Sequence, residues 1–298
     1  MSAAVEQALA LIRDRRPDSI DKALALLQNT VYSFSMKVCG HPEDAEDTMQ
    51  EVLLKSIPHL PKFESPRALA VWLYKVARNR CISSRRGEKN SVGKNISLDE
   101  LMPDSRELSE LLSKTPSPEA AALNRESGEH VRQAVLAIPP AYRMVLVLHD
   151  MEELSTAEVA QITGLREGTV RVRLHRARLL VRRYLTNLAK GTAPGSLELH
   201  AAIEGARPQR CRRLFALLSD YMDGVVDDAV CDEMDRHINQ CEPCQVFLAS
   251  LKGAVERCRS YTPAWDSQRA KELRQELMGQ YQQAIEALEK ARTQTIPG

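Results

Sequence analysis

The sequence predicts an all-α protein, and three observations support this. Aromatic residues make up only 4% of the 298 residues, while alanine, leucine, arginine and glutamate recur throughout. These residues lose little side-chain freedom in a helix and therefore favour helices over strands. Apolar side chains recur at helical spacing, and no stretch approaches the ~20 consecutive apolar residues of a membrane span. We expect a helical protein that stays in the cytoplasm and makes no membrane contact.

Shifts in composition divide the chain into modules. Residues 91–120 are polar, and a turn-rich segment follows at Gly191–Gly195, so both are expected to be linkers. They separate a first helical domain at 1–90 from a second at 121–190. A small domain is expected at 197–262, and a C-terminal amphipathic helix at 263–298.

The first domain contains two amphipathic helices. Pro42 stands where a first helical residue is tolerated, and an apolar stripe follows it. A second helix is predicted to begin at Ser65, a capping residue followed by proline, and its outer face is basic. The stripe of the earlier helix consists of Ala45, Met49, Val52 and Leu53.

The second domain carries the pattern of a helix-turn-helix. Ser155 and Glu158 form a capping box, and Gly164 is placed to end the short helix that follows. A further helix begins near Glu167, which is the single acid among seven arginines between Leu165 and Arg183. Two short helices joined by a glycine turn, the second rich in arginine, are typical of a DNA-binding helix-turn-helix.

The arginine-rich helix is expected to enter the major groove of DNA. A solvated basic face is the ordinary interpretation of such a run, but the capping box and glycine turn in register favour DNA binding. Arg171 and Arg176 are the best candidates for reading bases, because a guanidinium can bind guanine through two hydrogen bonds. The side chains expected to face away from the buried stripe are Arg171, Val172, His175, Arg176 and Arg178. Arg166, Arg178 and Arg182 are expected to contact the phosphate backbone.

The cysteines indicate a metal site rather than a disulfide framework. Five of the seven lie after residue 210, and His237, Cys241 and Cys244 have the short spacing of metal ligands. Three thiolate and imidazole donors suit tetrahedral Zn²⁺, which needs a fourth. From the residues alone, either Cys211 or Cys231 could supply it.

Two sets of segments resemble extracytoplasmic-function (ECF) sigma factors. Ile138–Arg143 with Leu154–Arg178 looks like region four, and Asp44–Val52 with Trp72–Arg80 looks like region two. The resemblance implies binding to core RNA polymerase through Asp47, Gln50 and Glu51. It also implies recognition of the −35 element by region four, and of the −10 element by the Leu60–Glu64 loop with Arg78, Asn79 and Arg80. Ser83 departs from the family pattern, which usually has aspartate there.

The cysteine segment resembles a zinc anti-sigma domain. That resemblance implies the ligand set Cys211, His237, Cys241 and Cys244, with Cys211 as the fourth donor on the first helix of the domain. The expected function is an ECF sigma factor that is regulated in cis through intramolecular contact with this domain, with inhibition of the sigma regions as the hypothesis. The alternatives are a C-terminal activator or partner-docking module, or a plain helix-turn-helix regulator that never binds polymerase.

An enzyme is not expected. The sequence has no His-Glu-x2-His motif, and a tetrahedral site filled by four protein ligands leaves no open position for water. The chain is instead marked by charge asymmetry, since the arginine-rich helix is followed by an acidic stretch after Ser219. The C-terminal helix has an apolar stripe that begins with Leu273, Leu277 and Tyr281. Its partner could be the zinc domain, the sigma regions or another chain.

Overall fold

A computed structural model of the chain describes residues 3–14, 16–84, 96–103, 107, 127–188 and 209–294. All regular elements in these ranges are helices, which confirms the predicted all-α fold. No described helix is long and apolar enough to cross a membrane. The predicted linker at Gly191–Gly195 and most of the linker at 91–120 lie outside the described residues.

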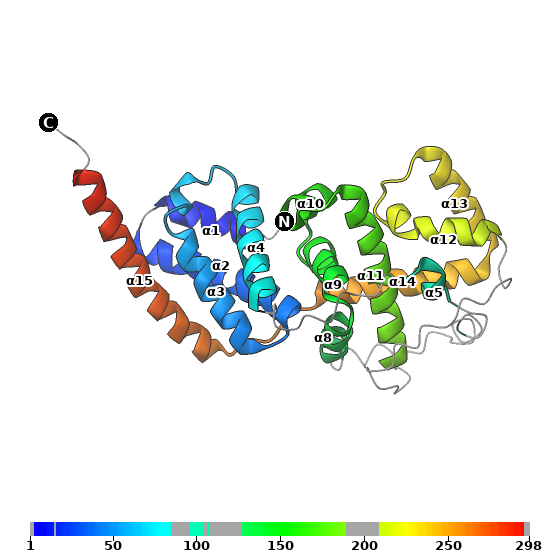
Figure 1. Cartoon of the computed structure of the whole chain (residues 1–298), viewed down its shortest axis with the longest axis horizontal. Coiled ribbons are helices and arrows are strands. Elements are labelled where there is room, and N and C mark those ends of the chain that lie inside the picture. Colours follow the sequence, from blue (N-terminus) through cyan, green and yellow to red (C-terminus); the bar gives the residue numbers. More distant parts are fainter. Residues whose placement is uncertain are drawn as a thin grey trace. The chain divides into compact units, whose positions relative to one another are not determined.

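The helices are named as in Figure 1. They are α1 Ala3–Asp14, α2 Pro17–Cys39, α3 Pro42–Ser56, α4 Pro66–Ser84, α5 Leu98–Leu101, α8 Ser127–Ala137, α9 Pro140–Leu146, α10 Thr156–Thr163, α11 Glu167–Leu188, α12 Gln209–Met222, α13 Asp228–Gln240, α14 Glu242–Ser260 and α15 Ser267–Gln294. A 3₁₀ turn at Leu60–Lys62 (η1) precedes α4, and a π-helical turn at Val147–Met151 (η3) follows α9.

The chain forms two compact units that do not follow the order of the sequence. One unit contains residues 1–89, 152–164 and 262–298, and the other contains residues 90–151 and 165–261. Helix α10, the first helix of the predicted helix-turn-helix, therefore packs with the predicted region two. The domain boundaries proposed from composition remain a prediction.

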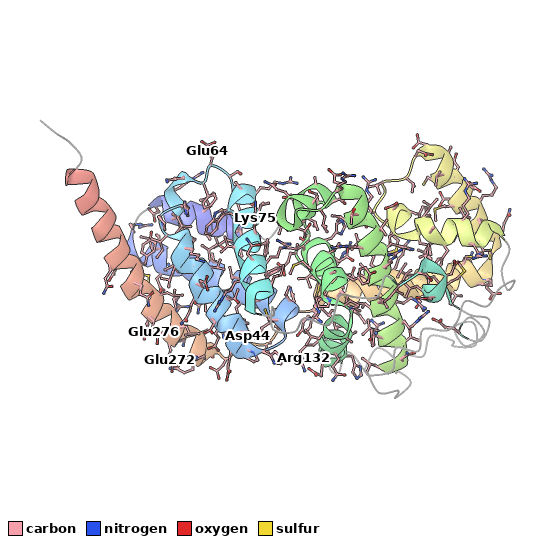
Figure 2. The ribbon with its side chains drawn as sticks, in the orientation of Figure 1. Asp44, Glu64, Lys75, Arg132, Glu272 and Glu276 are labelled. Carbon is pink, nitrogen blue, oxygen red and sulfur yellow. The ribbon has the colours of Figure 1, made fainter. Side chains whose placement is uncertain are left out.

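The first unit is a bundle of α1–α4 that α10 and α15 join. Its interior is filled by fully buried apolar side chains, among them Phe34, Met49 and Leu73. Helix α15 lies along α2 and α3 (Figure 1), and Leu273 and Leu277 are buried on its inner side. Glu272 and Glu276 lie on its exposed side (Figure 2).

The segment before α15 anchors it to α2. The indole of Trp265 stacks on the ring of Tyr32 at 3.9 Å between centroids, and Gln28 donates a hydrogen bond to the Ala270 carbonyl at 2.9 Å. Asp266 caps the helix by accepting bonds from the Gln268 and Arg269 amides. The partner of the predicted C-terminal stripe is therefore the region-two helices.

The second unit is built around α11. Helices α8, α9, α12 and α14 pack against it, and α13 packs against α12 and α14 (Figure 1). The predicted apolar stripe of α11 is buried through Val170, Leu174, Ala177 and Val181. The described part of the 91–120 segment includes the short helix α5, whose Ser97 forms a capping box with Glu100.

The local signals of the helix-turn-helix are confirmed. Ser155 accepts a bond from the Glu158 amide, while the Glu158 carboxylate accepts from the Ser155 amide at 2.8 Å. Gly164 ends α10 with a φ of +70°, a left-handed conformation that glycine adopts without strain. Thus α10 begins and ends, and α11 begins, where the residue pattern predicted.

Candidate metal centre and nucleic-acid interface

The structure brings four metal-type ligands to one point. The ligand atoms of Cys211, His237, Cys241 and Cys244 all lie within 4.8 Å of one another. His237 Nε2 is 3.4 Å from the Cys211 sulfur and 3.3 Å from the Cys244 sulfur. These are the residues that the sequence predicted as a ligand set. The competing residue Cys231 lies outside the cluster, where its thiol faces Asp235 at 3.9 Å.

Helix ends position these side chains. His237 occupies the last turn of α13, Cys241 is the residue between α13 and α14, and Cys244 lies in the first turn of α14. Pro243 in that turn forces a new helix to begin, which turns Cys244 back toward His237. Cys211 comes from the start of α12 and closes the group from the other side.

The cluster fits a tetrahedral metal ion. With bonds of about 2.1 Å to nitrogen and 2.3 Å to sulfur, tetrahedral ligand atoms lie about 3.6 Å apart. The nitrogen–sulfur distances given above are close to this value. Burial and the neighbouring thiols Cys241 and Cys211 raise the pKa of the Cys244 thiol well above its ordinary value. A cation bound among these atoms would favour the thiolate and reverse this shift.

The structure divides the predicted DNA-binding residues of region four into two groups. Arg166, Arg171 and Val172 are exposed, with Val172 at 51% of its surface, and Arg176 is half-buried. By contrast, His175 is 7% exposed and Arg178 only 1%. The sequence expectation that all of them face outward does not hold here, because α12 covers the side of α11 that carries these two.

Arg178 lies between two carboxylates. Its guanidinium binds Asp150 through two hydrogen bonds of 2.7 and 2.6 Å, and it contacts Asp223 at 2.9 and 2.8 Å. The Arg178 and Asp150 side chains are fully buried, whereas that of Asp223 is 17% exposed. A buried guanidinium requires such pairing, because an isolated charge in the interior is very costly. Asp150 belongs to η3 and Asp223 follows α12, so one arginine joins three segments of the unit.

Burial and the charge of Arg178 together determine the pKa values of Asp150 and His175. Burial alone would raise the pKa of Asp150, but hydrogen bonds from Arg178 and His149 hold it at about 2. Burial is also the main cause that lowers the pKa of His175 to about 4, followed by the charges of Arg178 and Arg176. His175 is therefore neutral at pH 7, and its Nδ1 lies 2.8 Å from the Ser219 hydroxyl.

Arg182 extends the contact further along α11. Its guanidinium carbon lies 4.1 Å from the centre of the Phe247 ring on α14, a cation–π geometry, and its side chain is 1% exposed. It also forms an ion pair with Glu107. Sequence reasoning assigned Arg182 to DNA phosphates and did not predict this packing.

Replacing Asp150 with asparagine is expected to destabilise the second unit. Removing one partner of a buried ion pair costs about 3–5 kcal/mol, because the other charge stays buried. The depressed Asp150 pKa means that its contribution, about 2 kcal/mol, is present above pH 4 and is lost as the pH falls toward 2. Urea unfolding at pH 7 and at steps down to pH 2 should show a less stable variant with a weaker acid dependence.

The control for this prediction is Glu129→Gln. The pKa of Glu129 is also lowered to about 2, mainly by the Arg132 hydrogen bond, but its side chain is 52% exposed. Exposed pairs contribute little to stability. If Asp150→Asn and Glu129→Gln lowered the free energy of unfolding equally, the buried Asp150–Arg178 pair would have no special part in stability.

The predicted region-two residues lie on α3 and α4. Asp47 is exposed, while Gln50 and Glu51 are half-buried. The Glu51 carboxylate pairs with Arg80 of α4 at 2.8 Å and with Lys55 at 2.6 Å. Arg78 is half-buried and Asn79 is exposed. The side chain of Ser83 lies outside the described residues.

Sequence reasoning missed Asp150, Ser219 and Asp223 as partners of α11. Only Asp223 carried a signal, since it belongs to the acidic stretch noted above. A single acid such as Asp150 in an apolar helix gives no indication of which arginine it will meet.

Three family profiles match consecutive parts of the chain. The profile described as "Sigma-70 region 2" matches residues 24–91, and that of "Sigma-70, region 4" matches residues 129–181. The profile described as "Putative zinc-finger" matches residues 211–245, a range that contains the Cys/His cluster. The matches follow the order of the predicted modules.

Three curated relatives are each similar to 57–63% of the chain. ECF RNA polymerase sigma factor SigW of Bacillus subtilis (strain 168) is 26% identical over 191 residues, which are 63% of this chain and 100% of that protein. ECF RNA polymerase sigma factor SigE of Mycolicibacterium smegmatis is 28% identical over 177 residues, 59% of this chain and 65% of that protein. RNA polymerase sigma factor YlaC of Bacillus subtilis is 28% identical over 173 residues, 57% of this chain and 93% of that protein.

Proposed function

Because the chain belongs to the ECF class of RNA polymerase sigma factors and carries a zinc-finger segment after region four, we propose that it is a sigma factor restrained by its own C-terminal domain. It directs core polymerase to promoters through regions two and four. The bound metal is one zinc ion, held by Cys211, His237, Cys241 and Cys244. The observation that carries the restraint is the burial of Arg178 between Asp150 and Asp223.

The proposed restraint arises because the α12 segment covers part of the DNA-reading side of α11. The exposed residues Arg166, Arg171 and Val172 form one part of the proposed −35 surface, with Arg176 beside them. His175 and Arg178, the other part, are held by Ser219 and Asp223 of the α12 segment. A carboxylate on Arg178 takes the place that a DNA phosphate would occupy. Region four therefore needs release of α12 before it can use its whole reading surface.

Region two is restrained differently. Helix α15 reaches α3 through an ion pair of 3.1 Å between Arg269 and Glu46, yet the neighbouring Asp47 stays exposed. Asp47, Gln50 and Glu51 are the proposed contacts with core polymerase. We therefore expect the restrained protein to bind polymerase while its −35 reading remains weak. Arg78, Asn79 and Arg80 are the proposed contacts with the −10 element, and Arg80 must leave Glu51 to make them.

The zinc ion has a structural part in this proposal. When bound, it joins the start of α12 to the junction of α13 and α14, so that Ser219 and Asp223 are held in position at the other end of α12. RNA synthesis itself belongs to the polymerase, and no catalytic role is assigned to this chain. Since polymerase and chromosome share the bacterial cytoplasm, we place the protein there.

Binding to core polymerase tests the proposal directly. Full-length protein mixed with purified bacterial core polymerase should co-elute on gel filtration, and the complex should start transcripts at defined sites on fragmented genomic DNA. Core enzyme alone is the control, and mapping of transcript 5′ ends would reveal the promoter sequence. Absence of co-elution would reduce the chain to a DNA-binding regulator that does not act through polymerase.

A further inference from the structure

Two buried cysteines meet inside region two. The sulfur of Cys39 lies 2.7 Å from the sulfur of Cys81, and these residues are only 1% and 2% exposed. Both are reduced thiols in the structure. The bond of a disulfide is about 2.05 Å long, so the two sulfurs would have to approach by only about 0.7 Å to form it. The pair is therefore placed for covalent bond formation.

The pair lies where helices end. Cys39 is the last residue of α2, and Gly40 ends that helix in the left-handed conformation. Cys81 lies in the last turn of α4, which ends at Ser84. On α3, the Thr48 hydroxyl oxygen lies 4.0 Å from the Cys81 sulfur. Helix ends open locally more readily than helix centres, and such opening admits a small oxidant to sulfurs that are otherwise buried.

We propose that Cys39 and Cys81 form a reversible disulfide when the protein meets hydrogen peroxide, so that region two carries an oxidation site of its own. Cytoplasmic thiols are kept reduced, and the disulfides that do form there are usually transient or redox-sensing. This site is separate from the Cys/His cluster, which belongs to the other compact unit. The proposed zinc ion would also occupy the sulfurs of that cluster.

The reaction consumes two thiols and one peroxide. One thiolate attacks a peroxide oxygen and the O–O bond breaks, which leaves a sulfenic acid on the sulfur and a hydroxide that takes up the released thiol proton. The second sulfur then attacks the sulfenic sulfur and displaces its oxygen as water. In total the two thiols lose two electrons and two protons, and hydrogen peroxide is reduced to two molecules of water. A second thiol within reach favours the disulfide over further oxidation to a sulfinic acid.

The bond would tie the end of α2 to the last turn of α4. The residues proposed for the −10 element, Arg78, Asn79 and Arg80, directly precede Cys81 on α4. A link between positions 42 residues apart removes freedom from the opened chain, so the end of α4 should open less often after oxidation. Oxidation therefore stiffens the helix turn that carries the proposed DNA contacts. The disulfide itself does not depend on the proposed sigma function.

Peptide mapping of the full-length, zinc-loaded protein tests the site. Treatment with hydrogen peroxide, then alkylation and digestion, should yield two peptides linked through Cys39 and Cys81, which dithiothreitol separates again. Hydrogen–deuterium exchange of the amides of residues 78–81 should be about tenfold slower in the oxidised protein than in the reduced one. Cys39→Ala should give neither result, whereas Cys258→Ala, which removes another buried thiol, should give both.

Three results would overturn the inference. The first is oxidation of Cys39 or Cys81 to a sulfinic acid by excess peroxide with no linked peptide. The second is a linked peptide that forms only after the protein has been unfolded in urea. The third is linkage of either residue to a cysteine of the Cys/His cluster instead. All three are measured on the wild-type protein, so they hold even if Cys39→Ala does not fold, and polymerase binding is tested separately.

Discussion

Asp223→Arg is expected to increase transcription by the full-length protein at least tenfold. The substitution removes one carboxylate from Arg178 and places a positive charge beside its guanidinium. Arg178 keeps Asp150, so the docking of α12 on α11 should weaken by about 2 kcal/mol, roughly thirtyfold, the lower end for breaking a desolvated charge pair. Run-off transcription with core polymerase, on a template identified by transcript mapping, measures the gain.

Asp232→Arg is the matched control for this prediction. Asp232 lies on the exposed side of α13, and no contact between it and α11 is described. Its replacement by arginine makes the same change of charge as Asp223→Arg. It separates loss of docking from a general gain in DNA affinity caused by added positive charge, which would raise both variants alike. Wild-type activity for Asp223→Arg, with the fold intact by circular dichroism, would contradict restraint through Arg178.

Removal of the metal is expected to have the second large effect. Cys244→Ser or Cys211→Ser should lower the zinc content from about one ion per chain to near zero, whereas Cys231→Ser should retain it. Binding of zinc to sites of this type contributes about 10–16 kcal/mol to local folding, so α12–α14 should unfold without it. Metal analysis by mass spectrometry and thermal unfolding of the full-length proteins measure both effects.

Transcription links the two experiments. If zinc holds Ser219 and Asp223 against α11, the ligand variants should be at least as active as Asp223→Arg. A cysteine variant that loses zinc but remains as restrained as wild type would show that the metal does not support the docking. Loss of zinc from Cys231→Ser would instead mean that the fourth ligand is misassigned.

The sequence by itself determined the features that depend on neighbouring residues. The capping box at Ser155 and Glu158, the glycine that ends α10 and the buried stripe of α11 all follow from the backbone and side-chain preferences of a few consecutive positions. The spacing of His237, Cys241 and Cys244 likewise requires only helix geometry and a proline. Resemblance then supplied the order of region two, region four and the zinc segment, which the profile matches confirm.

Only the tertiary structure decided what covers each surface. A helix with an apolar stripe and a basic face can leave that face to solvent, to DNA or to another part of the chain, and local periodicity is the same in every case. The burial of His175 and Arg178, the packing of α15 on α2 and α3, and the Glu152 contact with Lys37 each join residues far apart in sequence. Long-range pairing of charges depends on where whole helices pack, which no single segment encodes.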